Sequence, residues 1–380
     1  MKSSDKIKHA ILYYIFLPFS IFFYNKQKNT WLISERGDEA RDNGYYFYKY
    51  LKEKHPNINV KYVITKDSKD IKMIDKEDIV FYRSFKHYMY FINSKYLISS
   101  HNMGFSPLFW VFVNLDTKGL IYTHGKRIFL QHGITYNTVP SLVKKKIDLF
   151  FTVADKETKF VIEKFGYNDK IVKCVGFPRF DYFENNIKDY ILIMPTWRRD
   201  LNGVSKEDFH KSEYFKKWSS LLKNDKFNKL LEQTNTKVLF YPHYEMQKFI
   251  DLFETNNKNI IMARAEQYSI HDLLDECKMF VTDYSSTNFD VAYNDKPLIY
   301  YQFDYNSFYS IHYGEGYMNL KKDGFGPVVE TEEEFVKEFE KIINNKYKNQ
   351  TKYTKKIKEF YSNNDRKNCD RIYDEIIKLK

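Results

Sequence analysis

The sequence is poor in cysteine and glycine. Its three cysteines, Cys174, Cys277 and Cys369, are too few and too scattered for a disulfide framework or a zinc site, and this favours a reducing compartment such as cytosol. Thirteen glycines in 380 residues exclude collagen-like or linker-like character. No P-loop and no GxGxxG segment occurs, so neither glycine-rich nucleotide-binding motif is available to explain the chain.

Composition and charge narrow the class of protein further. A hydrophobic fraction of 43% excludes a disordered chain, a mean hydropathy of −0.60 excludes a polytopic membrane protein, and the length suggests two domains. The net charge of +11 is concentrated at the two ends, in residues 1–29 and 346–380. A DNA-binding protein usually carries a basic stripe on its folded domain. The nearly neutral middle therefore makes nucleic acid an unexpected partner.

An uncharged aromatic segment lies near the N-terminus. Residues 10–24, AILYYIFLPFSIFFY, are too short for a membrane-spanning helix, are interrupted by Pro18, and lack a following signal-peptide cleavage site. Aromatic rings suit the lipid headgroup boundary, and the flanking lysines suit anionic lipid. We therefore expect residues 1–29 to attach to an anionic membrane surface; the alternative is a helix buried in the protein's own core.

Beyond this segment, short apolar runs alternate with helical stretches. Such alternation predicts parallel sheets with crossover helices, and the pattern restarts near residue 190. We expect two α/β halves, at 30–185 and 186–335, followed by a helical tail at 336–380. Thr331 before a run of glutamates predicts the start of a helix over 331–345. The expected strands, in most cases followed by a polar turn or loop, lie within 29–37, 60–65, 96–101, 127–133, 149–154, 190–198, 237–243, 259–264, 279–286 and 297–304.

Two histidines directly follow expected strands, where parallel sheets bind their ligands. His132, in QHG, is suited to general-base chemistry near neutral pH, and the alternative is a structural histidine in a buried turn. His243, in YPH, belongs to the other half and is suited to donate to developing negative charge. A simple loop histidine explains YPH comparably well. We expect the two rings to face each other across an interdomain cleft.

The segment TDYSSTNFD, residues 282–290, follows another expected strand. Ser285, Ser286 and Thr287 lie where the next helix begins, and three consecutive hydroxyls there favour a phosphate site over an ordinary N-cap. In PTWRRD, Arg198 is suited to clamp a diphosphate, and the alternative is a surface arginine pair. No DxD stands at a strand end, so we predict no metal and no other cofactor.

Taken together, these segments resemble the CDP-glycerol glycerophosphotransferase family, which includes teichoic acid primases and polymerases. The resemblance covers about residues 30–330, and TDYSS…FD…KP with a further Asp is its most specific part. It implies a GT-B-like fold of two Rossmann-like halves with the site between them. The matching segments are SERGDEARDNGYYFYKYL, QHG, GFPRFD, PTWR, YPH and VTDYSSTNFDVAYNDKPLIYYQFD.

The resemblance also implies a reaction. An acceptor hydroxyl, typically of a lipid-linked cell-wall or capsule glycan precursor, attacks the β-phosphorus of CDP-glycerol and releases CMP. His132 is the implied base, and His243 lies near the diphosphate. Asp290 is expected to order the site or to contact ribose. The residues expected to bind the donor are Arg198, Thr196, Asp283, Ser285, Ser286, Thr287 and Asp290.

Other functions remain to be weighed against this one. Many family members read HGT with a nearby lysine, whereas here QHG is followed by Ile134 and no lysine occurs before Lys144. CDP-ribitol could replace CDP-glycerol, a GT-B glycosyltransferase would use a nucleotide sugar, and an inactive membrane scaffold would need none of the polar residues above. The expected location is the inner face of a bacterial plasma membrane.

Overall fold

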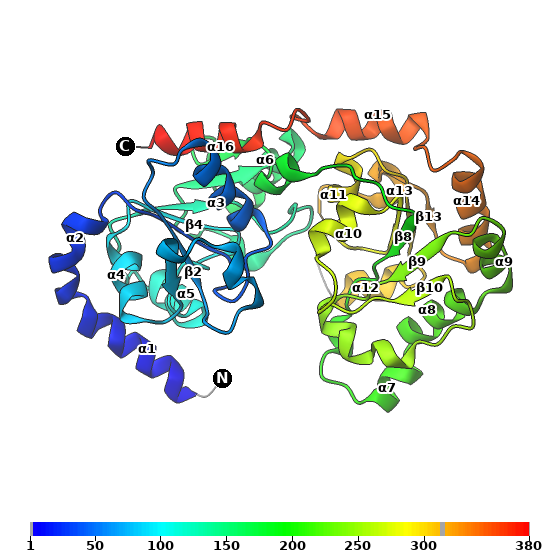
Figure 1. Ribbon diagram of the computed structural model, residues 1–380, viewed down its shortest axis with the longest axis horizontal. Coiled ribbons are helices and arrows are strands. Elements are labelled where there is room, and N and C mark those ends of the chain that lie inside the picture. The colour runs from blue at the N-terminus through cyan, green and yellow to red at the C-terminus, as the bar shows by residue number, and fades with distance from the viewer. Residues whose placement is uncertain (1–2, 312–315, 380) are drawn as a thin grey trace. The chain divides into compact units, whose positions relative to one another are not determined.

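The structure is a computed structural model that describes residues 3–311 and 316–379. The chain forms two compact units (Figure 1). The first unit comprises Met1–Ile134, Pro140–Tyr182 and Ser362–Lys380, and the second comprises Thr135–Val139 and Phe183–Tyr361. Each unit contains its own parallel sheet with helices packed against it.

The first unit is built on a seven-stranded sheet in the order β3-β2-β1-β4-β5-β6-β7, and every pairing is parallel. Its strands are β1 (Trp31–Ser34), β2 (Val60–Ile64), β3 (Ile79–Phe81), β4 (Tyr96–Ser99), β5 (Lys126–Phe129), β6 (Leu149–Thr152) and β7 (Val172–Cys174). Its α-helices are α1 (Ser3–Phe16), α2 (Ile21–Gln27), α3 (Asn43–Lys54), α4 (Phe85–Asn93), α5 (Phe109–Thr117), α6 (Asp155–Phe165) and α16 (Asn368–Ile377). Its 3₁₀ turns are η1 (Pro18–Ser20), η2 (Lys69–Met73), η3 (Lys76–Asp78), η4 (Pro140–Leu142) and η5 (Pro178–Tyr182).

The second unit is built on a six-stranded parallel sheet in the order β10-β9-β8-β11-β12-β13. Its strands are β8 (Tyr190–Ile193), β9 (Lys237–Phe240), β10 (Ile260–Met262), β11 (Met279–Thr282), β12 (Leu298–Tyr301) and β13 (Val328–Val329). Its α-helices are α7 (Lys206–Lys211), α8 (Glu213–Lys223), α9 (Asp225–Gln233), α10 (Ile270–Glu276), α11 (Asn288–Tyr293), α12 (Tyr305–Ile311), α13 (Leu320–Asp323), α14 (Glu332–Asn344) and α15 (Thr351–Phe360). Two 3₁₀ turns are η6 (Arg199–Leu201) and η7 (Tyr244–Leu252).

A strand occurs in each of the ten expected segments, and most of these strands are short apolar runs buried on both faces of their sheet, although β10 leaves Ile261 exposed. Three short strands, β3, β7 and β13, did not stand out in the sequence. Helix α14 begins with the expected capping box, in which Thr331 and Glu334 satisfy each other's backbone amides.

The C-terminal segment is shared between the two units. Helices α14 and α15 pack within the second unit, whereas α16 returns to the first. The apolar side chains Ile372 and Ile376 of α16 are fully buried in the core that surrounds Trp31. The Asp181 carboxylate accepts hydrogen bonds from the first amides of α16, those of Asn368 and Cys369. The sequence predicted one helical tail over residues 336–380. In the structure the last helix of this segment, α16, belongs to the first unit.

The N-terminal helices cover part of the first unit. Tyr13 of α1 is fully buried against Phe91 of α4 and Phe112 of α5, and Nδ1 of His9 lies 2.7 Å from the Tyr88 hydroxyl. Within the described part of the chain, no single helix is long and apolar enough to cross a membrane. A pair bent by 46°, Asp5–Phe16 with Pro18–Gln27, reaches the required length and composition together.

Candidate active site

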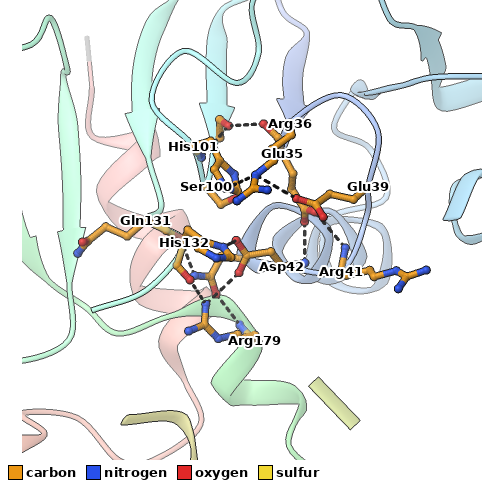
Figure 2. A network of polar contacts seen from close by, with 12 residues as sticks. Glu35, Arg36, Glu39, Arg41, Asp42, Ser100, His101, Gln131, His132 and Arg179 are labelled. Atoms are coloured by element: carbon orange, nitrogen blue, oxygen red, sulfur yellow. Dashed lines mark hydrogen bonds and ion pairs between the residues drawn. The ribbon is translucent and has the colours of Figure 1, made fainter. Parts of the chain in front are cut away.

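His132 lies at the carboxyl end of β5 in the first unit, among polar side chains from neighbouring segments (Figure 2). Its Nδ1 is 2.7 Å from Oδ2 of Asp42, which immediately precedes α3. Nη1 of Arg179, in η5, donates to Oδ1 of Asp42 at 2.9 Å and to the His132 carbonyl at 2.8 Å. The His132 side chain is 61% exposed, whereas those of Asp42 and Arg179 are each 10% exposed. The exposed imidazole of His132 is thus hydrogen-bonded to the buried ion pair of Asp42 and Arg179.

The residue before the histidine has an unusual backbone conformation. Gln131 has φ +60°, in the left-handed region that non-glycine residues rarely adopt. Its side-chain Nε2 donates to the Phe151 carbonyl at 2.6 Å and to Glu157 Oε1 at 3.0 Å. Its own carbonyl accepts from Asn43 Nδ2 at 2.8 Å. These buried contacts hold the turn that presents His132.

A second buried carboxylate, Glu35, orders the loop between β1 and α3. It accepts hydrogen bonds from the backbone amides of Arg41, Asp42 and Tyr45 at 2.8–3.0 Å. Burial and the neighbouring Asp42 and Glu39 carboxylates raise the pKa of Glu35, and the amide donors oppose this shift. The loop that carries Asp42 is therefore fixed by hydrogen bonds to its own backbone.

His101 lies beside His132, with ring centroids 4.8 Å apart. Its Nε2 accepts from Nε of Arg36 at 3.0 Å, and its Nδ1 is 3.1 Å from the Ser100 hydroxyl. Burial and the adjacent His132 lower the pKa of His101 well below its ordinary value, and Arg36 adds to this shift. A neutral ring whose Nε2 accepts a hydrogen bond carries its proton on Nδ1.

Asp42, His101 and His132 each offer one metal-ligating atom, and the three atoms lie within 4.8 Å of one another. The 2.7 Å between Asp42 Oδ2 and His132 Nδ1 is a hydrogen-bonding distance. Tetrahedral zinc, with bonds of about 2.0–2.1 Å, would spread its ligand atoms to about 3.3 Å. The observed spacing fits a shared proton better than a shared cation.

Arg198, at the end of β8 in the second unit, is bound by protein groups, and its expected role as a phosphate clamp stays a prediction. Its side chain is only 5% exposed. Nη2 donates to Asp283 Oδ2 at 2.8 Å and to Asp304 Oδ1 at 3.1 Å, and Nε donates to Asp304 Oδ2 at 2.8 Å. Nη1 donates to the carbonyl of Thr196 at 2.8 Å and, at 3.5 Å, to that of Trp197. Protein acceptors thus occupy all the guanidinium nitrogens, and the residue ties the ends of β8, β11 and β12 together.

The other predicted donor-binding residues divide into buried and accessible groups. Asp283 is fully buried and accepts from the amides of Thr196 and Tyr284, and Asp290 is buried within α11, so both belong to the interior. Ser285, Ser286 and Thr287 are partly exposed at the start of α11, where the Ser285 and Thr287 hydroxyls lie 2.8 Å apart. The structure thus places these three hydroxyls at the helix start, as expected, while their binding of phosphate stays a prediction.

His243 lies in the same unit, just after β9 and at the start of η7. Its Nδ1 accepts from the Glu245 amide at 3.2 Å, and its ring stacks at 6.2 Å on Trp197, next to Thr196. An acceptor role for Nδ1 puts the proton of a neutral ring on Nε2, which suits the expected donor function. His132 and His243 belong to different units, so their expected meeting across a cleft stays a prediction.

A hollow with a volume of 490 Å³ lies at the carboxyl end of β12. Gln302, Asp304, Tyr305, Ser307 and the Lys321–Glu330 ion pair line part of it. The volume is in the range of small-molecule sites. The structure therefore adds a polar hollow next to the carboxylate that holds Arg198.

Several residues of these two clusters did not emerge from the sequence. Asp42 and Arg179 both lie in segments that carry the family resemblance, but their contact with His132 spans 90 and 47 positions of the chain. Asp304 closes the last resembling segment and follows a strand, so the strand-end rule would have found it. His101, within SSH, also follows a strand, so the strand-end rule does point to it but gives it no role.

Comparison with known proteins shows the family of the chain. A sequence model of CDP-Glycerol:Poly(glycerophosphate) glycerophosphotransferase matches residues 15–378. The minor teichoic acid biosynthesis protein GgaB of Bacillus subtilis is 31% identical over 397 residues, covering 100% of this chain and 43% of GgaB. A teichoic acid poly(glycerol phosphate) polymerase of Bacillus spizizenii is 22% identical over 351 residues, covering 82% of this chain and 83% of that protein.

Solved structures show the same fold. A variant of the wall teichoic acid polymerase TagF superposes with a TM-score of 0.70 at 18% identity, covering 100% of this chain and 98% of that one. The UDP-GlcNAc 2-epimerase of Methanocaldococcus jannaschii gives a TM-score of 0.54 at 10% identity over 92% and 99% of the two chains. The chain spans less than half the length of GgaB, and these likenesses establish fold and family. The chain belongs to the CDP-glycerol:poly(glycerophosphate) glycerophosphotransferase family.

Proposed function

We propose that the chain transfers glycerol phosphate from CDP-glycerol to an acceptor hydroxyl, with His132 as the base. The observation that carries this proposal is the exposed imidazole of His132, held by Asp42 at a strand end, in a chain of this family. A solved structure of TagF obtained with CDPG supports CDP-glycerol as the donor to test first. The acceptor is a polyol phosphate or a lipid-linked glycan precursor.

The reaction needs one proton transfer and one exchange of bonds at phosphorus. The acceptor hydroxyl attacks the β-phosphorus of CDP-glycerol while its proton passes to Nε2 of His132. The new P–O bond forms, the bond from the β-phosphorus to the bridging oxygen breaks, and CMP leaves with that oxygen. Such transfers depend mainly on positioning and charge stabilisation, so few catalytic groups are needed.

The second unit supplies the groups that we assign to the donor. Nε2 of His243 is suited to donate a hydrogen bond to the diphosphate, because Nδ1 is occupied by the Glu245 amide. The partly exposed hydroxyls of Ser285, Ser286 and Thr287 add further donors at the start of α11. Arg198 contributes by holding the strand ends in place.

Ligand-induced thermal stabilisation tests the donor. CDP-glycerol, CDP-ribitol, CMP, UDP-glucose and UDP-GlcNAc are added separately, and we expect CDP compounds to raise the unfolding temperature. Ribitol is tested because two relatives, 23% and 22% identical over 44% of this chain, are ribitol-phosphate polymerases. Stabilisation by a UDP sugar alone would identify a glycosyltransferase instead, and no stabilisation by any compound would favour the scaffold.

Turnover tests the base. We expect His132→Ala to lower CMP release from CDP-glycerol by about 10²–10⁴-fold, the usual contribution of a general base. Binding of CDP-glycerol, measured by calorimetry, should change little. His210→Ala, at an exposed histidine of α7, is the matched control and should retain full turnover. Normal turnover by His132→Ala would remove His132 from the mechanism.

We also propose that helices α1 and α2 attach the chain to the inner face of a bacterial plasma membrane. Although α1 buries one apolar side, Ile7, Ile11 and Ile15 form a second side and remain 59%, 51% and 51% exposed. Ile21 and Phe22 of α2 are 72% and 78% exposed. Exposed lysines lie nearby in the same segment: Lys6, Lys8, Lys26 and Lys28. Apolar contact with charge attraction to anionic lipid is the usual basis of such attachment.

Vesicle flotation tests this attachment without removing the helix, whose inner side is part of the core. Replacing Ile7, Ile11 and Ile15 together by Gln should weaken binding to vesicles containing phosphatidylglycerol by about tenfold or more, since three half-exposed isoleucines are lost. Ile377→Gln is the control, because Ile377 is equally exposed on α16. Undiminished flotation of the triple variant would refute attachment through α1.

A further inference from the structure

Asp42 occupies the N-cap position of α3, yet its side chain does not cap the helix. An N-cap aspartate ordinarily accepts from the second or third amide of its helix. Here Oε1 of Glu35 takes that role, accepting from the amides of Asp42 at 2.8 Å and Tyr45 at 2.9 Å. Glu35 directly follows β1, at the start of the loop that leads to α3 (Figure 2). The carboxylate of Asp42 therefore makes no capping hydrogen bond to α3 and can bind other partners.

Both oxygens of Asp42 are directed to the histidine and its support. Oδ2 meets Nδ1 of His132 at 2.7 Å, and Oδ1 accepts from Nη1 of Arg179 at 2.9 Å. The same Arg179 nitrogen donates to the carbonyl of His132 at 2.8 Å (Figure 2). One guanidinium nitrogen thus connects the carboxylate that meets the ring with the backbone that carries the ring.

The charge of Asp42 determines which ring nitrogen holds the proton. Burial by itself would raise the pKa of Asp42, but His132 and Arg179 outweigh it and lower that pKa. An ionised carboxylate only accepts hydrogen bonds, so the proton in the 2.7 Å contact belongs to Nδ1 of His132. The lone pair of a neutral ring then lies on Nε2, on the side away from Asp42.

The backbone supports the same orientation. Gln131 keeps its left-handed φ of +60° because buried partners hold both its side chain and its carbonyl. Strain of this kind costs about 1–3 kcal/mol and persists where the surroundings over-determine it, often at functional sites. Asn43 takes part directly, donating to the Gln131 carbonyl and accepting from the Arg179 amide.

We propose that Asp42 and Arg179 are positioning residues for His132. Asp42 keeps the proton on Nδ1 so that Nε2 accepts the proton of the acceptor hydroxyl, and Arg179 holds both Asp42 and the His132 backbone. This assignment rests on the proposed role of His132 as the base. When Nε2 takes the proton, the O–H bond breaks and the N–H bond forms, and the nearby Asp42 carboxylate stabilises the imidazolium until the proton passes to solvent.

Asp42→Asn tests the proposal by kinetics. The side-chain amide introduced by this substitution can donate a hydrogen bond to Nδ1 of His132, and this favours the tautomer that carries its proton on Nε2. In that tautomer Nε2 has no lone pair and cannot accept the proton of the acceptor hydroxyl. We expect kcat for CMP release to fall by about 10²–10⁴-fold, as when the carboxylate of a catalytic histidine is replaced elsewhere. KM for CDP-glycerol should stay within about twofold. Asp78→Asn is the control, because Asp78 is an equally buried, ion-paired carboxylate of the same unit that meets lysines. It should retain kcat.

The tautomer itself is read by NMR of protein labelled with ¹⁵N-histidine. The His132 signals are identified by their absence in His132→Gln. In the wild-type protein at alkaline pH, Nδ1 should be the protonated nitrogen, and in Asp42→Asn it should be Nε2. Arg179→Lys, which keeps one donor, should retain more turnover than Arg179→Ala.

Three results would overturn the proposal. The first is an unchanged kcat in Asp42→Asn, and the second is the same His132 tautomer in the variant and the wild-type protein. The third is turnover lost on treatment with EDTA and restored by Zn²⁺, which would assign Asp42, His101 and His132 to a metal ion instead. If His132→Ala remains active, the proposed base fails, while the tautomer measurement still reports separately on Asp42.

Discussion

Replacing Arg198 by Ala distinguishes a structural role for this residue from a ligand-binding one. The change removes the buried partner of two carboxylates, Asp283 and Asp304, whose side chains are 0% and 7% exposed. Asp283 would keep the amides of Thr196 and Tyr284, and Asp304 would keep the Tyr284 hydroxyl. Each carboxylate would lose its only charged partner among the described residues.

The expected loss of stability follows from the ion pairs that are broken. Removing one partner of a buried pair typically costs about 3–5 kcal/mol, because it leaves an uncompensated charge. The guanidinium also lies 4.9–5.2 Å from the rings of Tyr214, Tyr284 and Phe308, and those contacts are lost too. Since domains are stable by about 5–15 kcal/mol, we expect the second unit to become marginal.

Urea unfolding measures this loss. Arg199→Ala is the matched control, because Arg199 is the next residue along the chain and is exposed, so its loss should cost less than about 0.5 kcal/mol. A double-mutant cycle with Asp304→Asn should give a coupling free energy of about 0.5–3 kcal/mol, because the two side chains are in direct contact. An unchanged urea midpoint with weakened CDP-glycerol binding in calorimetry would refute this reasoning and restore the phosphate clamp.

Two further predictions concern stability. Burial lowers the pKa of His87 to about 4, with Nδ1 accepting the Arg83 amide and Nε2 meeting the Phe105 carbonyl. Below pH about 6.5, His87 is protonated in the unfolded chain but stays neutral in the folded one. The free energy of unfolding should therefore fall by up to about 1.4 kcal/mol per pH unit between pH 6.5 and 4. In urea titrations His87→Gln should flatten this decline, and an equal slope in the variant would contradict the prediction. Thr331→Ala should lower the free energy of unfolding by about 1 kcal/mol, seen as a lower urea midpoint, because the α14 cap is lost. Thr351→Ala should lower it less, because α15, which begins at Thr351, has no side-chain cap hydrogen bond.

The strands could be predicted because their signal is local. Runs such as YLIS before His101 and RIFLQ before His132 are short and apolar, and a strand buried on both faces needs nothing else. The three strands that escaped prediction have two or three residues each, although β10, also of three residues, was predicted. The strand-end rule then found His132 and His243, since both directly follow such runs.

The sequence position of Arg198 did not reveal its carboxylate partners in the structure. At a strand end, an arginine bound to phosphate and an arginine bound to carboxylates have the same sequence pattern. The choice depends on Asp283 and Asp304, which lie 85 and 106 positions away. Asp290, expected to order the site or to contact ribose, is buried in α11, and its role stays a prediction.

The N-terminal segment has one buried and one exposed apolar side, so membrane attachment through it stays a prediction. From the sequence we expect a membrane contact, and the alternative is a core helix. In the structure, α1 buries Tyr13 and leaves Ile7, Ile11 and Ile15 exposed. A helix with apolar residues around its whole circumference can pack on the protein with one side and still present the other.

The amino-acid sequence by itself determined the two-part α/β architecture, the strand-end histidines and the family, because hydrophobic periodicity and short motifs are properties of neighbouring residues. Only the tertiary structure decided that Glu35 caps α3, that Asp42 therefore reaches His132, and that Arg198 is enclosed by carboxylates. These pairings join residues that are distant in the chain. Their energies depend on which strands lie side by side and on how deeply each charge is buried, and neither is encoded in a local pattern.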